Sequence, residues 1–260
     1  MSDLSSTPAQ AASPTPAKSS ARSLTYAAWM RAAGEEQTRL VRLLDGLTDE
    51  QWRSPTDCDG WSVRDIVAHL AGAAASTATL RELVRQAWLS RRIGTEGDLV
   101  DRMNQVQVSE RLDLVPADLT ADLVLQARRG LASRRRLPAP LRALRLPFGP
   151  PLGTRPLGYL MGRIYTRDAW MHRIDLARAA GAPLELTAEH DGALVEDVVA
   201  EWAGAHGSAY KLTLTGVAGG SWRAGDPPAA EALRLDAVEF VRTMSGRAAG
   251  AGLLARGVPF

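Results

Sequence analysis

Four long stretches with apolar residues at helical spacing fill most of residues 24–181, and they constrain the fold more than any other feature of the chain. Short connections containing proline, glycine and aspartate separate these stretches, so neighbouring helices can turn back on one another. Helices joined in this way bury their apolar faces against each other in a four-helix bundle. The expected helices lie at residues 26–46, 62–90, 97–137 (broken near Pro116) and 156–180.

The pattern changes after Pro183, where alternating apolar and polar residues typical of strands appear beside further helical segments. A pair of glycines and the SWRAG motif that follows them indicate a hairpin partner for the first of these strands. This part of the chain is therefore expected to be α+β. The expected elements are a helix at 187–204, strands at 210–216 and 233–237, and a closing helix at 237–247.

We therefore expect a mainly α-helical protein, a four-helix bundle followed by a small α+β C-terminal domain. The first residues are rich in Ser, Pro and Ala and lack the apolar stretch of a signal peptide, which indicates a disordered tail. The Pro- and Gly-rich segment 137–156 is expected to be a loop. The predicted boundaries are 1–23 for the tail, 24–181 for the bundle and 182–260 for the C-terminal domain.

Composition excludes several classes of site and partner. Lys and Arg number 31 against 29 Asp and Glu, so the net charge of +2 gives little reason to expect a nucleic-acid partner. Basic residues gather in RRGLASRRRL (128–137), but no aromatic residue is interleaved with them, which favours a solvated helix face. No apolar run approaches the ~20 residues that span a membrane.

The single cysteine, Cys58, excludes an intramolecular disulfide and a zinc site built from cysteines. This composition fits the reducing cytoplasm, where we expect the protein to be located. No feature near Cys58 marks an activated thiolate, so it is interpreted as a packing or incidental thiol.

Two ionisable residues interrupt the apolar stripe of the fourth predicted helix, RIYTRDAWMHRIDLARAAG. Asp168 and His172 are separated by one helical turn and lie close to the middle of the face that should be buried. Burying such a pair costs several kcal/mol unless a partner compensates. The spacing suits two ligands of one metal ion, and a buried ion pair is the structural alternative.

A third ligand is available on the second helix, which begins in GWSVRDIVAHLAG (60–72). His69 lies at the margin of its apolar stripe and can meet the fourth helix. Two histidines and one carboxylate leave a coordination position open, as in catalytic zinc sites. Asp65 has the same spacing to His69 and could close a four-ligand site, although a capping box with Ser62 already explains it. Asp175 is either a partner behind His172 or a solvent-facing residue.

These residues resemble a known family. LTDEQWRSPTDCDGWSVRDIVAHLAG, followed about 100 residues later by DAWMHRIDLARAAG, is similar to the mycothiol-dependent maleylpyruvate isomerase family, which belongs to the DinB-like four-helix bundles. The resemblance covers residues 24–181 and extends more loosely to LTLTGVAGGSW and EFVRTMSGR…GLLARGVPF. It implies a divalent metal, usually zinc, bound by His69, Asp168 and His172. The family usually has Glu where this chain has the shorter Asp168.

The resemblance also implies an activity and its partners. The metal would hold the thiol of mycothiol, a cosubstrate, as a thiolate that adds to a small electrophilic substrate in an isomerase or thiol-transferase reaction. Arg247 is the candidate catalytic residue of the C-terminal domain, and a surface Arg near a helix end is its structural alternative. No nucleic-acid or membrane partner is expected, and a homodimer is left open.

Two other functions remain open from the sequence. A non-catalytic metal-binding regulator or interaction protein would bind metal without turning over a thiol-dependent substrate. A metal-dependent hydrolase would use bound water and need no thiol. The sequence contains none of the motifs G-x-S-x-G, G-x-x-x-x-G-K and G-x-G-x-x-G, so it does not predict a serine hydrolase, a P-loop protein or a dinucleotide-binding protein.

Overall fold

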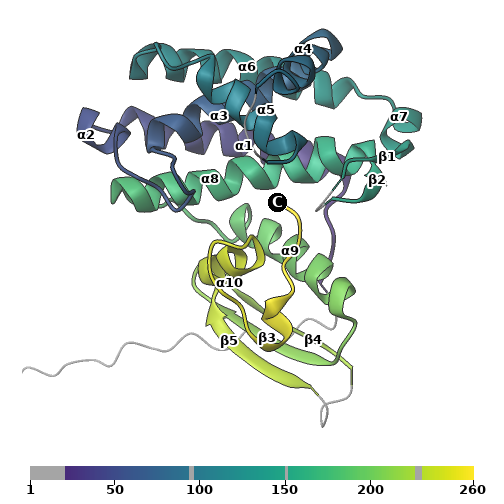
Figure 1. Ribbon diagram of the computed structural model, residues 1–260. Helices are drawn as coiled ribbons and strands as arrows, with labels where there is room; N and C mark the ends of the chain where they lie inside the picture. Colours follow the sequence, from purple (N-terminus) through teal and green to yellow (C-terminus); the bar gives the residue numbers. More distant parts are fainter. Residues whose placement is uncertain (1–20, 94–96, 150–151, 226–229) are drawn as a thin grey trace, which may run out of the picture.

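The computed structural model describes residues 21–93, 97–149, 152–225 and 230–260. Figure 1 shows a layer of helices packed over a smaller part that combines helices with a sheet. The helical layer contains a four-helix bundle. In this bundle, α6 (Pro116–Arg136) and α8 (Tyr165–Ala180) each pack against both α1 (Tyr26–Asp45) and α3 (Val63–Ala78). This confirms the predicted fold class.

Two of the predicted helices are divided. The segment predicted at 62–90 forms α3 and α4 (Leu80–Ser90) because Thr79 adopts an extended conformation and caps α4 with its side chain. The segment predicted at 97–137 forms α5 (Leu99–Ser109) and α6, with the break before Pro116 as expected. Both α4 and α5 pack against α3, and the single turn α2 (Asp49–Trp52) precedes it.

The prediction that residues 137–156 form a loop is wrong. They contain the short helix α7 (Ala139–Ala143) and an antiparallel hairpin of β1 (Arg145–Pro147) and β2 (Thr154–Pro156). Pro140 lies in the first turn of α7, where its fixed backbone angle is accepted, and three-residue edge strands tolerate proline at their ends. A turn of π-helix, η1 (Tyr159–Ile164), leads directly into α8.

The C-terminal part is α+β, as predicted. Its central strand, β3 (Tyr210–Thr215), pairs antiparallel with β4 (Gly220–Ala224) and parallel with β5 (Glu231–Asp236). Leu212 of the central strand lies opposite Trp222 on one side and Leu233 on the other, and the first two are fully or nearly fully buried. This part also contains α9 (Asp191–His206), α10 (Ala237–Met244) and the short 3₁₀ helix η3 (Gly252–Ala255).

One apolar cluster joins the bundle to the C-terminal part. It includes Trp29 of α1 and Trp170 of α8 together with Val198 and Trp202 of α9. A second cluster lies within the bundle around α3. The domain boundary predicted between residues 181 and 182 stays a prediction, and this apolar cluster contains residues from both sides of it. The predicted tail lies outside the described residues, apart from its last three.

The basic segment 128–137 is not entirely a solvated helix face. Four of its arginines are exposed, but Arg134 is buried, because its guanidinium bonds to the carbonyl of Met161 at 2.5 Å and to the hydroxyl of Thr166 at 2.9 Å. Burial lowers the pKa of Arg134 to about 10. Among the described residues, no helix is both long and apolar enough to cross a membrane.

Candidate metal centre

The start of α3 positions His69. Ser62 caps the helix through a capping box, in which the Asp65 carboxylate accepts a hydrogen bond from the backbone N–H of Ser62 at 2.9 Å. His69 follows one turn after Asp65 and is 5% exposed. The competing role of Asp65 as a metal ligand is therefore not supported, because its carboxylate is engaged at the helix end.

Helix α8 brings the other two predicted ligands to His69. His172 Nε2 lies 3.4 Å from Asp168 Oδ1, and His69 Nε2 lies 3.4 Å from Asp168 Oδ2. The ligand atoms of the three side chains all lie within 4.8 Å of one another. Both imidazoles are buried, whereas the Asp168 side chain is 26% exposed and forms the open side of the cluster.

The distances fit a metal ion. An ordinary N–H···O hydrogen bond spans about 2.7–3.2 Å, so contacts of 3.4 Å are long for direct bonds. A tetrahedral ion with ligand bonds of about 2.1 Å separates neighbouring ligand atoms by about 3.4 Å, and each Nε2 lies at that separation from a different oxygen of the Asp168 carboxylate. Two imidazole nitrogens and a carboxylate oxygen are donors that zinc and other divalent transition metals accept. The cluster therefore suits a divalent cation, although it does not select one metal.

A chain of buried amides holds His69. Its Nδ1 donates to Gln107 Oε1 at 2.9 Å, and Gln107 Nε2 donates to Gln86 Oε1 at 2.9 Å. Gln86 Nε2 in turn donates to the Glu82 carboxylate at 2.9 Å and to the Gly72 carbonyl at 3.0 Å. Each acceptor fixes the orientation of the amide that donates to it, so Gln107 presents its oxygen to His69. The proton of His69 therefore lies on Nδ1, and its Nε2 faces Asp168.

A carboxylate holds His172 in the same way. Asp175 is fully buried, and its Oδ2 accepts from His172 Nδ1 at 3.0 Å. The guanidinium of Arg247 makes two-pronged contact with that carboxylate, with Nη2 at 2.7 Å from Oδ2 and Nε at 2.8 Å from Oδ1. Of the two alternatives for Asp175, the partner behind His172 is the one that the structure contains.

The electrostatics of the cluster favour its charged forms. Burial alone raises the pKa of Asp168, but His172 and His69 outweigh it and hold that pKa well below its ordinary value. Burial lowers the pKa of His172, yet Asp168 and Asp175 together raise it well above its ordinary value. The pKa of Asp175 is lowered, because hydrogen bonds from His172 and Arg247 overcome the opposing effect of burial.

Arg247 reaches the centre from the turn after α10. Gly246 adopts a left-handed conformation with φ of +81°, which reverses the chain, and the Arg247 N–H bonds back to the carbonyl of Arg242 at 2.9 Å. The side chain then extends to Asp175 and places Nη2 3.5 Å from His172 Nδ1. The predicted catalytic candidate is therefore beside the cluster, in contact with Asp175 rather than with Asp168 or His69.

Sequence reasoning missed three residues that pack beside the imidazoles or hold them through hydrogen bonds. Trp61 lies with its ring centroid 5.3 Å from that of His69 and 6.4 Å from that of His172. Gln86 and Gln107 are buried on α4 and α5. A polar side chain on the buried face of a helix needs a hydrogen-bond partner, and this requirement is the sequence signal that could have identified them.

Cys58, interpreted from the sequence as a packing or incidental thiol, lies beside His172 and Asp175. Its sulfur is 3.7 Å from Asp175 Oδ2 and 4.0 Å from His172 Nδ1, and it also packs against the apolar cluster of the bundle. Cys58, His172 and Asp175 form a second group with metal-ligand spacing. Its carboxylate is already occupied by Arg247, so the group around Asp168 is the better site.

Comparison with known proteins gives the fold and the family. Two solved structures of a mycothiol-dependent maleylpyruvate isomerase, one of them a point mutant, match with a TM-score of 0.57 each. Their sequence identities are 17% and, for the mutant, 15%, and each match covers 86% of this chain and 90% of the other. A search of curated proteins finds no match.

A family profile described as the mycothiol maleylpyruvate isomerase N-terminal domain matches residues 33–177. That range includes all three clustered side chains on α3 and α8, and it covers more than half of the chain. The resemblance noted in the sequence is confirmed: the chain belongs to the mycothiol maleylpyruvate isomerase N-terminal domain family.

Proposed function

We propose that this protein is a metal-dependent enzyme that uses mycothiol to act on a small electrophilic substrate, as an isomerase or a thiol transferase. The observation that carries the proposal is the pair of 3.4 Å separations between the Asp168 carboxylate and the two Nε2 atoms. Membership of the family supports the thiol, since the matching solved structures are of a mycothiol-dependent enzyme. Zinc is the metal that we expect.

The chain's own residues prepare the centre for a ligand. Gln107 and Asp175 occupy the two Nδ1 atoms, so each imidazole offers Nε2 on the same side. When bound, a divalent metal keeps a coordinated thiol deprotonated at neutral pH. Trp61 packs beside both rings and places an apolar surface next to the centre.

Arg247 is the proposed catalytic residue of the C-terminal part. Its Nε and Nη2 are engaged by Asp175, whereas Nη1 makes no hydrogen bond to any described residue. Its side chain keeps 15% of its surface exposed, which leaves this donor for an anionic or hydroxyl group of the cosubstrate or substrate. Addition of the thiolate to an electrophilic double bond leaves a single bond that can rotate, and elimination then breaks the C–S bond, re-forms the double bond and releases the thiolate.

The test joins thiol binding to turnover. In cobalt-loaded protein, mycothiol should produce a sulfur-to-cobalt charge-transfer band, and His172→Gln should abolish it while His206→Gln on α9 leaves it intact. Zinc-loaded protein should then consume maleylpyruvate or the electrophile monochlorobimane only when mycothiol is present. Hydrolysis without thiol would assign the centre to a hydrolase, and metal binding without a thiol band would contradict an enzyme of this type.

A further inference from the structure

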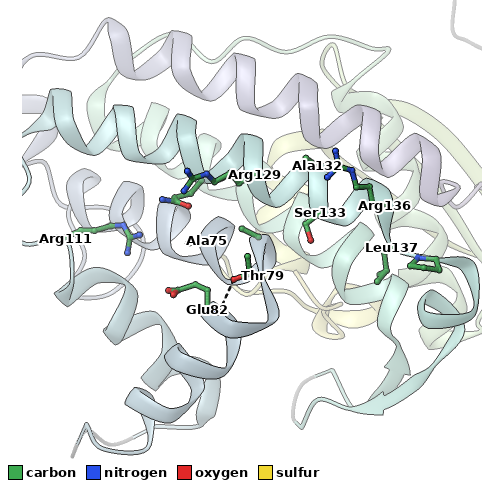
Figure 2. Close-up of a pocket in the computed structure, with 12 residues that line it drawn as sticks. Ala75, Thr79, Glu82, Arg111, Arg129, Ala132, Ser133, Arg136 and Leu137 are labelled. Carbon is green, nitrogen blue, oxygen red and sulfur yellow. Dashed lines mark hydrogen bonds between the residues drawn. The ribbon is translucent and has the colours of Figure 1, made fainter.

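A groove of about 800 Å³ lies between α6 and the junction of α3 with α4. One of its walls is a face of α6, on which Arg129, Ser133 and Arg136 follow one another at helical spacing. The facing wall carries Thr79 and Glu82, which are joined by the cap at the start of α4 (Figure 2). None of the three candidate metal ligands lines this groove.

The charged residues of the groove divide into paired and unpaired ones. Glu82 is neutralised by Arg85 at 2.6 Å, and Arg111 by Asp122 at 2.8 Å. Arg129 and Arg136 are exposed and line the same groove, and neither guanidinium makes a hydrogen bond or ion pair with any residue that the structure describes. The groove therefore carries two uncompensated positive charges.

The surrounding sequence reinforces this charge. The stretch 123–167 contains ten arginines and no acidic residue, although the whole chain has a net charge of only +2. Within that stretch, Arg163 and Arg167 are neutralised by Asp197 of α9. Most of the others lie in the C-terminal half of α6 and the segment that follows it, so the field around the groove attracts anions.

The shape of the groove narrows the class of ligand. Its volume lies in the range of about 300–1,000 Å³ that is usual for small-molecule sites. Ala75, Ala78 and Ala132 provide apolar surface, and no aromatic residue lines the groove, so a nucleobase would find no ring to stack on. The rise of an α-helix separates the backbones of Arg129 and Arg136 by about 10 Å.

We propose that this groove binds a small molecule with a negatively charged group at each end and an apolar, non-aromatic middle. A guanidinium accepts a carboxylate or a phosphate through two parallel hydrogen bonds, so Arg129 would hold one end and Arg136 the other. The hydroxyl of Ser133 lies between them on the same face of α6. This site shares no ligand residue with the metal centre, although Glu82 also accepts from Gln86 of the amide chain, and it stands even if the proposed thiol chemistry fails.

Calorimetric titration of the full chain with linear dicarboxylates of four to ten carbons, and with alkyl bisphosphates of the same lengths, tests the proposal. Affinity should rise to a maximum at an intermediate length, and matched monoanions should bind at least tenfold more weakly. The series that binds more tightly identifies the anionic group. No saturable binding by either series at millimolar concentration, or affinity that ignores length, would overturn the proposal.

A pair of double variants separates a specific site from general positive charge. Arg129→Gln combined with Arg136→Gln should weaken binding of the best dianion at least tenfold. Arg128→Gln combined with Arg135→Gln removes the same charge from exposed positions of α6 that do not line this groove, and it should leave the affinity within about twofold. Equal losses in both double variants would show non-specific attraction and refute the site.

Discussion

The Nδ1 atoms of the two imidazoles in the candidate centre are hydrogen-bonded to chemically different groups. A neutral amide accepts the Nδ1 proton of His69, whereas a buried carboxylate accepts that of His172. A carboxylate partner raises the basicity of a ligating imidazole more than an amide does. The two histidines are therefore expected to respond differently when their partners are changed.

Replacing Gln107 should weaken metal binding without unfolding the chain. Gln107→Leu removes the acceptor of His69 Nδ1 and frees the ring to rotate or change tautomer, so zinc affinity should fall by about 10- to 100-fold. Gln105→Leu, at an exposed position of the same helix, is the matched control. Competition titration with a chromophoric chelator measures both, and unchanged affinity in Gln107→Leu would show that the amide chain does not hold the ligand.

Metal binding should release a proton near neutral pH. Because the pKa of His172 in the metal-free protein is raised well above its ordinary value, its ring is protonated at pH 7 and must lose about one proton to bind metal. Zinc affinity should therefore increase as the pH rises toward that raised pKa and decrease as the pH falls.

Calorimetry in buffers of different ionisation enthalpy counts the released protons. Asp175→Asn removes one of the carboxylates that raise the pKa of His172, so it should reduce proton release at pH 7. Equal proton release from the parent and from this variant would contradict the assigned role of Asp175.

At the scale of elements, the close approach of α5 to α3 places the amide chain. A Cβ added at Gly72 would lie only 2.4 Å from Gln107 Cβ, so only glycine allows the two helices to come this near. Helix α8 also packs against α3, and the histidines that these two helices contribute are buried. The centre thus depends on helix packing rather than on a mobile loop.

Gly72→Ala should therefore disturb both stability and the centre. Separating α5 from α3 to admit the methyl group is expected to cost about 1–3 kcal/mol of unfolding free energy and to weaken zinc binding. Gly204→Ala is a control on α9, where an added Cβ meets nothing within 4 Å and the better helix propensity of alanine should stabilise slightly. Denaturant unfolding of both variants measures the difference, and equal stability would refute the packing argument.

The sequence predicted the bundle helices and the pair of Asp168 and His172 because both depend on local spacing, whereas the family resemblance implied that His69 joins this pair. Helical periodicity placed Asp168 and His172 on one buried face, and the capping box fixed the phase of His69. The hydrogen bonds that link Gln86 and Gln107 to His69 could not be predicted, since the packing of α4 and α5 against α3 depends on tertiary contacts. The break at Thr79 was missed because both flanking segments have strong helical patterns.

At the scale of the whole molecule, buried ion pairs connect the bundle to the C-terminal part. Arg173 of α8 contacts Glu36 of α1 at 2.5 Å and Asp191 at the start of α9 at 2.7 Å. A neighbouring group joins Arg167 to Asp197 and Glu201 of α9, each at 2.7 Å. The same association brings Arg247 to Asp175, so the C-terminal part completes the surroundings of the candidate centre.

Removing one member of this network should be strongly destabilising. Arg173→Met leaves two buried carboxylates without their shared cation and is expected to cost about 3–5 kcal/mol of unfolding free energy. Arg31→Met, at an exposed position of α1, should change stability by less than about 0.5 kcal/mol. Thermal and denaturant unfolding distinguish the two, and similar small effects would show that the network does not fasten the two parts together.

Metal content is the most direct measurement of the central claim, that α3 and α8 meet at one metal ion. Elemental analysis of protein reloaded with zinc should find about one zinc per chain in the parent and in His206→Gln. It should find almost none in His69→Ala, Asp168→Asn or His172→Ala, with circular dichroism confirming that these variants are folded. A parent protein that binds no zinc, or a His69→Ala variant that keeps a full equivalent, would contradict a shared metal centre.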